Sequence, residues 1–180
     1  MKQLITLFLI FICTHVFSQN DLNPNGLFYK ISLATTLGIN EEYTLFEEGE
    51  SGTLIEPSAF FVNNTFGYIF DKHTSLGLNF EYNWHSETGL HFFPAYLSFR
   101  YNVIPGDDNL FFRTGYGRFL NLGKSFETGT IYKVGAGVEI LDEDYKNAVL
   151  IGIDFSRKRF AYKQTEKLSS ISLFFEFMLF

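Results

Sequence analysis

Beyond its first twenty residues the sequence alternates between apolar and polar residues with a period of two, and no long segment places apolar residues at helical spacing. A period of two is typical of β-strands whose two faces meet different surroundings. The alternating segments end at clusters of residues that favour turns. The pattern predicts an all-β chain with eight strands, over residues 27–39, 59–70, 75–85, 91–103, 110–120, 130–141, 148–156 and 168–180.

The predicted strands are long enough to cross a bilayer, which takes about 9–11 residues of a tilted strand. Their connections alternate in length, as in outer-membrane barrels, where periplasmic turns are short and external loops are longer. The short turns are residues 71–74, 105–109 and 142–147. The predicted external loops are residues 40–57, 86–90, 121–129 and 157–167.

The two faces of the predicted strands differ in composition. One parity is apolar and aromatic, and over residues 75–85 it holds Leu76, Leu78, Phe80, Tyr82 and Trp84. The opposite parity carries an equal number of cations and anions: Lys30, Glu81, Arg100, Arg113, Lys133, Glu139, Asp154 and Glu176. It also carries glycines: Gly38, Gly67, Gly77, Gly115, Gly117, Gly135, Gly137 and Gly152. This second face is typical of the lumen of a narrow barrel, where buried ions need partners.

A soluble β-sandwich would explain the alternation equally well, with the apolar face inward and the charges in water. It would not explain why glycine, which weakens a strand, recurs on the solvent face. Nor would it explain why the apolar face is so aromatic near the strand ends. The pattern therefore favours an antiparallel up-and-down transmembrane β-barrel of eight strands, with its eight charged residues forming an ion-pair network in the lumen.

The first residues have the form of a secretory signal, because Lys2 is followed by an apolar run from Leu4 to Ile12 and by the small residue Ser18. The run is too short to span a bilayer as a helix. We predict a signal peptide over 1–18 and an outer-membrane β-barrel domain over 19–180. Cys13 then lies in the signal, which leaves the mature chain without a disulfide. The net charge of −6 argues against a nucleic-acid partner.

Three segments carry a resemblance to a known family: Arg113-Thr114-Gly115-Tyr116-Gly117, the run from Val134 to Glu139, and the terminal strand from Ser172 to Phe180. With its overall plan, the chain resembles the small eight-stranded outer-membrane β-barrels, such as the OmpA-type barrel domain and OmpX. The resemblance implies the cell outer membrane of a Gram-negative bacterium, with outer-membrane lipid and lipopolysaccharide as surroundings.

The same resemblance implies that the barrel assembly machinery recognises the C-terminal strand, since that machinery favours a C-terminal phenylalanine. In this chain Phe180 shares the parity of Glu176 and Ser172 rather than that of Phe177 and Leu179. Either a bulge near the end returns Phe180 to the lipid face, or the terminal signal departs from the usual pattern.

Catalytic candidates are few: His85, Ser86 and His91. Lipid A-modifying acyl hydrolases and acyltransferases among the barrels that this chain resembles use histidine and serine near the outer edge of the membrane. Adjacent strand residues point to opposite faces, however, which argues against a pair of His85 with Ser86. Two histidines without a third ligand make a poor metal site. The sequence therefore favours no catalytic residue, no metal and no cofactor.

The leading hypothesis is a non-enzymatic outer-membrane barrel with a charge-plugged lumen, which has a structural or surface-interaction role through its external loops and an unknown surface ligand. The loops of interest are the acidic stretch 41–56 and the basic stretch 157–167, which carries Arg157, Lys158, Arg159 and Lys163. Solvated loop charge is the plain alternative for both stretches. The alternative functions are a lipid A-modifying acyl hydrolase or acyltransferase, and a narrow conduit for solutes.

Overall fold

The structure is a computed structural model that describes residues 25–39, 55–85, 89–104, 108–123, 125–143, 146–161 and 165–180. The predicted signal peptide lies outside these ranges and stays a prediction, as does the domain boundary after residue 18. The described ranges contain no helix with the length and apolar character needed to cross a membrane.

The described residues form nine β-strands: β1 Gly26–Ile39, β2 Ile55–Ile69, β3 Thr74–His85, β4 Leu90–Phe92, β5 Pro94–Ile104, β6 Asp108–Phe119, β7 Gly129–Leu141, β8 Asn147–Phe160 and β9 Glu166–Leu179. The short β4 and the longer β5 both pair with β3 and are separated by Phe93 alone. They therefore occupy one position in the sheet, and each of the eight predicted strands has its counterpart.

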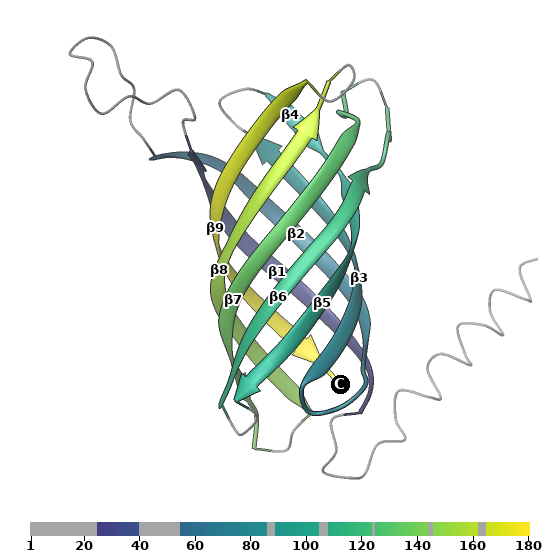
Figure 1. Ribbon diagram of the computed structural model, residues 1–180, viewed down its shortest axis with the longest axis vertical. Helices are drawn as coiled ribbons and strands as arrows, with labels where there is room; N and C mark the ends of the chain where they lie inside the picture. Colours follow the sequence, from purple (N-terminus) through teal and green to yellow (C-terminus); the bar gives the residue numbers. More distant parts are fainter. Residues whose placement is uncertain are drawn as a thin grey trace, which may run out of the picture.

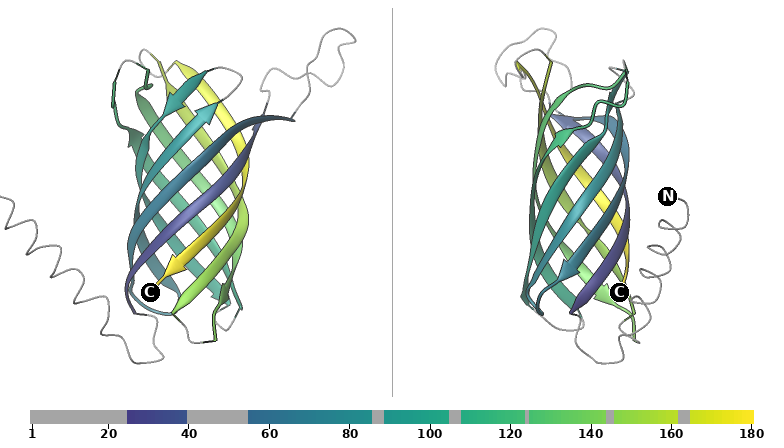
Figure 2. Two further views of the ribbon diagram at one scale, coloured as in Figure 1. Left: turned by 180° about the vertical axis from the view of Figure 1, so that it is seen from behind. Right: turned by 90° about the vertical axis from the view of Figure 1, so that its right-hand side faces the viewer.

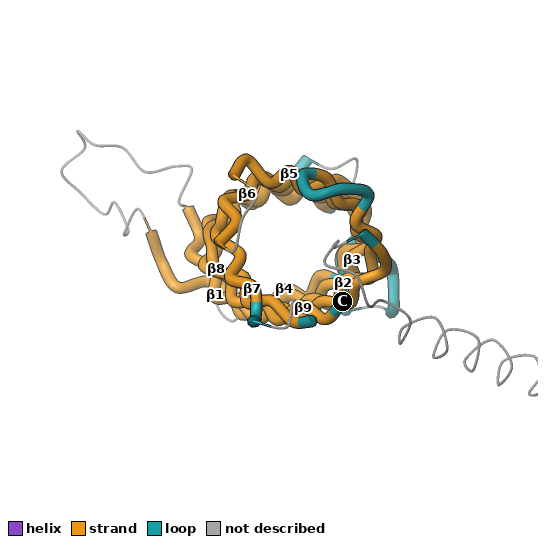
Figure 3. The backbone as a smooth tube through the Cα atoms, turned by 90° about the horizontal axis from the view of Figure 1, so that it is seen from below, coloured by secondary structure: helices purple, strands orange, loops and turns teal. Residues whose placement is uncertain are grey.

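These strands close into a single antiparallel barrel (Figure 1). With β4 and β5 counted as one strand, each strand pairs with its neighbours along the chain. Strand β1 also pairs with β9, so the first and last strands are adjacent. A view along the barrel axis shows the strands as a ring (Figure 3). The predicted fold class, an eight-stranded antiparallel up-and-down barrel, is confirmed for the described part of the chain.

The two ends of the barrel differ, and we name them by the predicted connections. The turn end is where β1 begins, β9 ends and the short turns connect β2 to β3, β5 to β6 and β7 to β8. The loop end is the opposite one, where β1 ends and β9 begins (Figure 2). At the turn end, Asp71 accepts hydrogen bonds from the backbone N–H groups of His73 (2.7 Å) and Thr74 (2.8 Å). These bonds and one from the Thr74 hydroxyl hold the pKa of Asp71 below its usual value.

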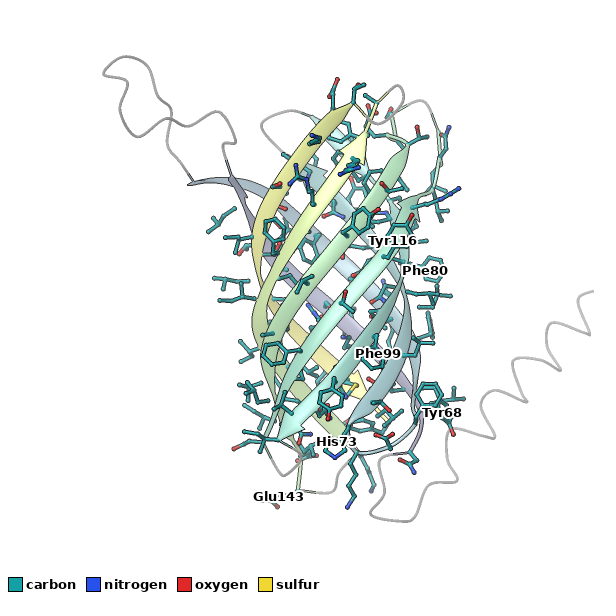
Figure 4. The ribbon with its side chains drawn as sticks, in the orientation of Figure 1. Tyr68, His73, Phe80, Phe99, Tyr116 and Glu143 are labelled. Atoms are coloured by element: carbon teal, nitrogen blue, oxygen red, sulfur yellow. The ribbon has the colours of Figure 1, made fainter. Side chains whose placement is uncertain are left out.

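Side-chain burial follows the predicted parity. On β3, Leu78 and Trp84 are 42% and 50% exposed, whereas Glu81 is 1% exposed. Phe80, Phe99 and Tyr116 are labelled among the side chains on the outer surface in Figure 4. The outer surface is therefore apolar and aromatic, and the polar parity lies inside the barrel.

Two predicted strand boundaries were wrong by four residues, and the others agree with the structure to within two. Strand β8 continues to Phe160, so Arg157, Lys158 and Arg159 belong to a strand rather than to the predicted loop 157–167. The alternation fails there because β8 carries arginines instead of apolar residues on its outward face near the loop end, while Lys158 points inward. Strand β2 also begins earlier than predicted, at Ile55, so the end of the predicted loop 40–57 is strand. The remainder of the acidic stretch, residues 40–54, lies outside the described residues, as does Lys163.

The last strand carries no bulge. Its pairing with β8 runs without a register shift from Glu166 to Leu179, and Phe180 therefore keeps the parity of Glu176. The Phe180 side chain packs against apolar residues inside the barrel, and its backbone N–H donates to the carbonyl oxygen of Lys146 at 3.1 Å. Of the two predicted alternatives, the structure has the one in which the terminal residue departs from the usual lipid-facing position.

Candidate functional site in the barrel lumen

The inward-facing charges are positioned by the pleat of the strands, which turns every second residue into the lumen. All eight residues predicted for the lumen network point inward, and each of them takes part in at least one ion pair with another of the eight. They form a larger group of six residues and a separate pair.

Arg113 is the centre of the larger group. Its guanidinium donates two hydrogen bonds to Asp154, at 2.8 and 2.6 Å, and a third to Glu176 at 2.7 Å. It also lies over the ring of Phe174, 3.7 Å from the ring centroid. Lys30 binds the second oxygen of Glu176 at 2.6 Å. This arrangement gives each of the two carboxylates a charged partner inside the barrel.

The group continues toward the loop end through Lys133. Its ammonium lies 2.6 Å from Glu81 and 3.8 Å from Asp154. Glu81 also accepts hydrogen bonds from the hydroxyl of Tyr96 (2.9 Å) and the amide of Asn83 (2.7 Å). Lys133 thereby links the carboxylate on β3 to the one on β8.

Arg100 and Glu139 form the separate pair, nearer the turn end. Their side chains meet at 3.1 Å, and Asn109 donates to the other oxygen of Glu139 at 2.9 Å. The Nε of Arg100 donates to Ser75 at 3.2 Å. Arg100 and Arg113 are paired in register on β5 and β6, and the two like charges reach different carboxylates.

Sequence reasoning missed one lumen cation, Lys158, which is 1% exposed. Its ammonium lies 3.0 Å from Nε2 of His85 and 3.4 Å from the amide oxygen of Asn83, and 5.3 Å from the centroid of the Phe92 ring. The sequence did contain a signal for this residue: Lys158 follows Asp154 by four positions, and residues an even number apart on one strand point to the same face. That signal was lost because the segment was interpreted as a loop.

The glycines on the inward face make room for large side chains. Phe111, Gly137, Gly152 and Phe174 stand opposite one another on β6, β7, β8 and β9. A Cβ added to Gly152 would lie 2.5 Å from the Phe174 ring, so the two rings occupy the space above the two glycines. Gly135 stands between Arg113 and Asp154 in the same manner and leaves their ion pair unobstructed.

Apolar side chains fill much of the remaining lumen. One cluster of buried residues contains Phe28, Ala34, Phe61, Ile69, Phe111, Ala148, Leu150, Phe174 and Met178. A second cluster lies at the loop end and contains Phe92, Tyr96, Phe119, Ile131 and Phe160. The ring of Phe92 is 5.0 Å from that of Phe119 and 5.1 Å from that of Phe160. The lumen is therefore packed by aromatic residues as well as by ions.

The structure does not bring the catalytic candidates together. His85 points into the lumen and is 1% exposed, whereas His91 lies on the outer side and contacts the hydroxyl of Tyr82 at 2.9 Å. Ser86 lies outside the described residues. Among the described residues, no group of three or more His, Cys, Asp or Glu side chains could hold a metal ion.

Comparison with known proteins gives a likeness in structure alone, because no family model and no curated protein matches the sequence. Neisserial surface protein A superposes with a TM-score of 0.64 at 12% identity, over 86% of this chain and 96% of that one. The N-terminal β-barrel domain of OprF from Pseudomonas aeruginosa superposes with a TM-score of 0.52 at 12% identity, over 87% of this chain and 99% of that one. The chain thus has the fold of the small eight-stranded outer-membrane β-barrels.

Proposed function

We propose that this chain is a non-enzymatic protein of the cell outer membrane, whose lumen is closed to ions and whose role, structural or in surface interaction, is exerted at the loop end. The outward apolar surface supports the membrane location: Leu97, Phe112 and Val134 are all more than half exposed and would meet lipid. Large apolar patches on a protein surface mark contact with other molecules or with membrane.

The observation that carries the proposal of a closed lumen is the ion-pair network together with the loop-end aromatic cluster. Eight strands enclose a space that side chains can fill. A permeating ion would have to separate contacts as short as 2.6 Å, such as those of Lys30 with Glu176 and Lys133 with Glu81. It would also have to pass between Phe92, Phe119 and Phe160.

Planar-bilayer recordings of the purified protein test the closed lumen. We expect no large, steady openings. A steady ion-conducting state would refute the proposal and favour the alternative of a narrow solute conduit. The double variant Phe92→Ala/Phe119→Ala tests the seal at the loop end without touching the ion pairs, and Lys72→Ala at the exposed turn end is its control.

Fractionation of cells that express the protein tests the membrane location. We expect the protein in the outer-membrane fraction, with a folded band that migrates differently from the heat-denatured one, because a closed barrel resists unfolding in detergent. Recovery as a soluble periplasmic monomer would refute the proposed location.

We also propose that the barrel assembly machinery recognises β9 through its outward residues Phe175, Phe177 and Leu179. The support is the burial pattern of β9, in which these residues are exposed and Phe180 is turned inward. In cells, Phe177→Ala should lower the yield of heat-modifiable barrel more than Phe180→Ala does. The reverse order would show that the terminal residue is the signal.

A further inference from the structure

A row of basic residues crosses the outer surface at the loop end. Arg118 on β6 stands opposite Thr130 on β7, Thr130 stands opposite Arg159 on β8, and Arg159 stands opposite Lys167 on β9. Residues paired in this way point to the same face of the sheet, which here is the outward face. Arg118, Arg159 and Lys167 are exposed, whereas Thr130 between Arg118 and Arg159 is only 7% exposed, and we call the three cations the basic row.

On β7, β8 and β9 the outward residues change from apolar to polar as the strands approach the basic row. The row one step toward the turn end is Tyr116, Tyr132, Arg157 and Ser169, and the next is Thr114, Val134, Phe155 and Ile171. The rings of Tyr116 and Tyr132 are 4.8 Å apart. Tyrosines of this kind form the aromatic girdle where a barrel meets the headgroups. The basic row therefore lies where lipid headgroups would begin.

The charges of the basic row are not balanced by the described part of the chain. Arg159 and Lys167 are directly opposite each other, an arrangement that is unfavourable for like charges on an antiparallel pair. No described carboxylate forms an ion pair with any of the three, although the chain as a whole has a net charge of −6. The neighbouring Glu166 has the opposite parity to Lys167. An anion from outside the chain would relieve this repulsion.

We propose that the basic row binds the phosphate groups of a phosphorylated glycolipid in the outer leaflet, the lipid A part of lipopolysaccharide. Guanidinium groups match phosphate oxygens in geometry and charge. The acyl chains of the same molecule would lie along Val134, Phe155 and Ile171. The site is confined to the side formed by β6 to β9, because β2 and β3 carry Phe60 and Trp84 on their outward faces near the loop end.

This inference rests on the proposed function, since it requires lipid around the barrel and the loop end outside the cell. Its test is native mass spectrometry of the full-length mature protein in detergent micelles, titrated with diphosphorylated lipid A and with the same lipid after enzymatic dephosphorylation. The unmodified protein should bind the phosphorylated lipid preferentially, and raising the NaCl concentration should weaken that binding.

The triple variant Arg118→Ala/Arg159→Ala/Lys167→Ala should bind diphosphorylated lipid A on the order of tenfold more weakly, because it loses three ion pairs with phosphate that solvent and salt partly screen. Lys72→Ala, which removes an exposed cation at the turn end, is the matched control and should bind as the unmodified protein does. The single variant Arg159→Gln should show a smaller loss in the same direction if the triple variant does not fold.

Three outcomes would overturn the inference: equal affinity for the phosphorylated and dephosphorylated lipids, an equal loss in Lys72→Ala, or an Arg159→Gln variant with unchanged affinity. Heat-modifiable mobility separates this failure from failure of the proposed function. A barrel that folds in lipid vesicles but shows no preference refutes only the glycolipid site. A protein that does not insert into lipid refutes the proposed function and the glycolipid site with it.

Discussion

Replacing Arg113 with alanine should destabilise the barrel far more than removing a solvent-exposed cation does. The change removes three hydrogen bonds to Asp154 and Glu176 and the contact with the Phe174 ring. Removing one partner of a buried ion pair costs about 3–5 kcal/mol, because the remaining charge has lost its compensation. Glu176 keeps Lys30 at 2.6 Å and Asp154 keeps Lys133 at 3.8 Å. We therefore expect a loss near the lower limit, about 3 kcal/mol.

Equilibrium unfolding by urea in lipid vesicles measures this loss. The chain has one tryptophan, Trp84, which is half exposed on the outer surface, so its fluorescence reports the transfer of the strand out of lipid. Arg113→Lys keeps the positive charge without the planar fork and should lose less stability than Arg113→Ala. Lys72→Ala at the turn end should change stability by less than about 0.5 kcal/mol.

The double variant Arg113→Ala/Asp154→Asn tests the cause of the loss. If the cost arises from an uncompensated carboxylate, neutralising Asp154 should recover part of the stability lost in Arg113→Ala, and the two effects will not add. Purely additive losses, or an Arg113→Ala variant as stable as Lys72→Ala, would refute the reasoning from buried charge.

Three further predictions concern other parts of the barrel. Leu78→Arg, on the outward face near the middle of β3, should cost about 2–4 kcal/mol in the same unfolding assay, whereas Leu78→Phe should be nearly neutral. Equal effects of the two substitutions would contradict a lipid-facing β3. Gly152→Ala should cost about 1–3 kcal/mol, because its methyl group meets the carbonyl oxygen of Ala136 as well as the Phe174 ring. Phe174→Leu in the same chain should recover only the part of that loss that the ring causes, and no recovery would assign the whole loss to the backbone contact. Titration of Asp71 by NMR should give a midpoint below the usual aspartate pKa of 3.8, because the hydrogen bonds of the turn stabilise the charged carboxylate, a contribution that is lost as the pH falls through the lowered pKa. A midpoint at or above 3.8 would contradict those hydrogen bonds.

The period of two predicted both the barrel and the orientation of its charges, because each strand separates lipid from lumen residue by residue. It could not predict the partners, since pairing depends on register between strands far apart in the sequence. Phe28, Phe111 and Phe174 share the inward parity of Lys30, Arg113 and Glu176. A single strand does not show that glycines on the neighbouring strands leave room for such rings.

Lys158 was missed, and Phe180 was left with two alternatives, for a different physical reason. Both lie near the end of a strand, where the outer face leaves the apolar layer or the chain terminates, so the contrast between the two faces weakens. At such positions the face to which a side chain points is set by how far the pairing between the strands continues, and the hydrophobicity of the residue does not reveal it. Residues whose neighbours form a clear apolar row, such as Leu78 or Glu81, were placed correctly.

The ion pair between Lys30 and Glu176 joins the first strand to the last, so its two charges lie on segments that are among the most distant in the sequence. Contacts of such high sequence separation form late and make folding slow, because the loop entropy of the whole chain must be lost first. Until β1 meets β9, Glu176 lacks the ammonium of Lys30 and the hydroxyl of Ser32, which donates to it at 2.7 Å across the same seam. Closing the barrel and completing its charge network are therefore one event, which favours an all-or-none transition over a partly closed sheet.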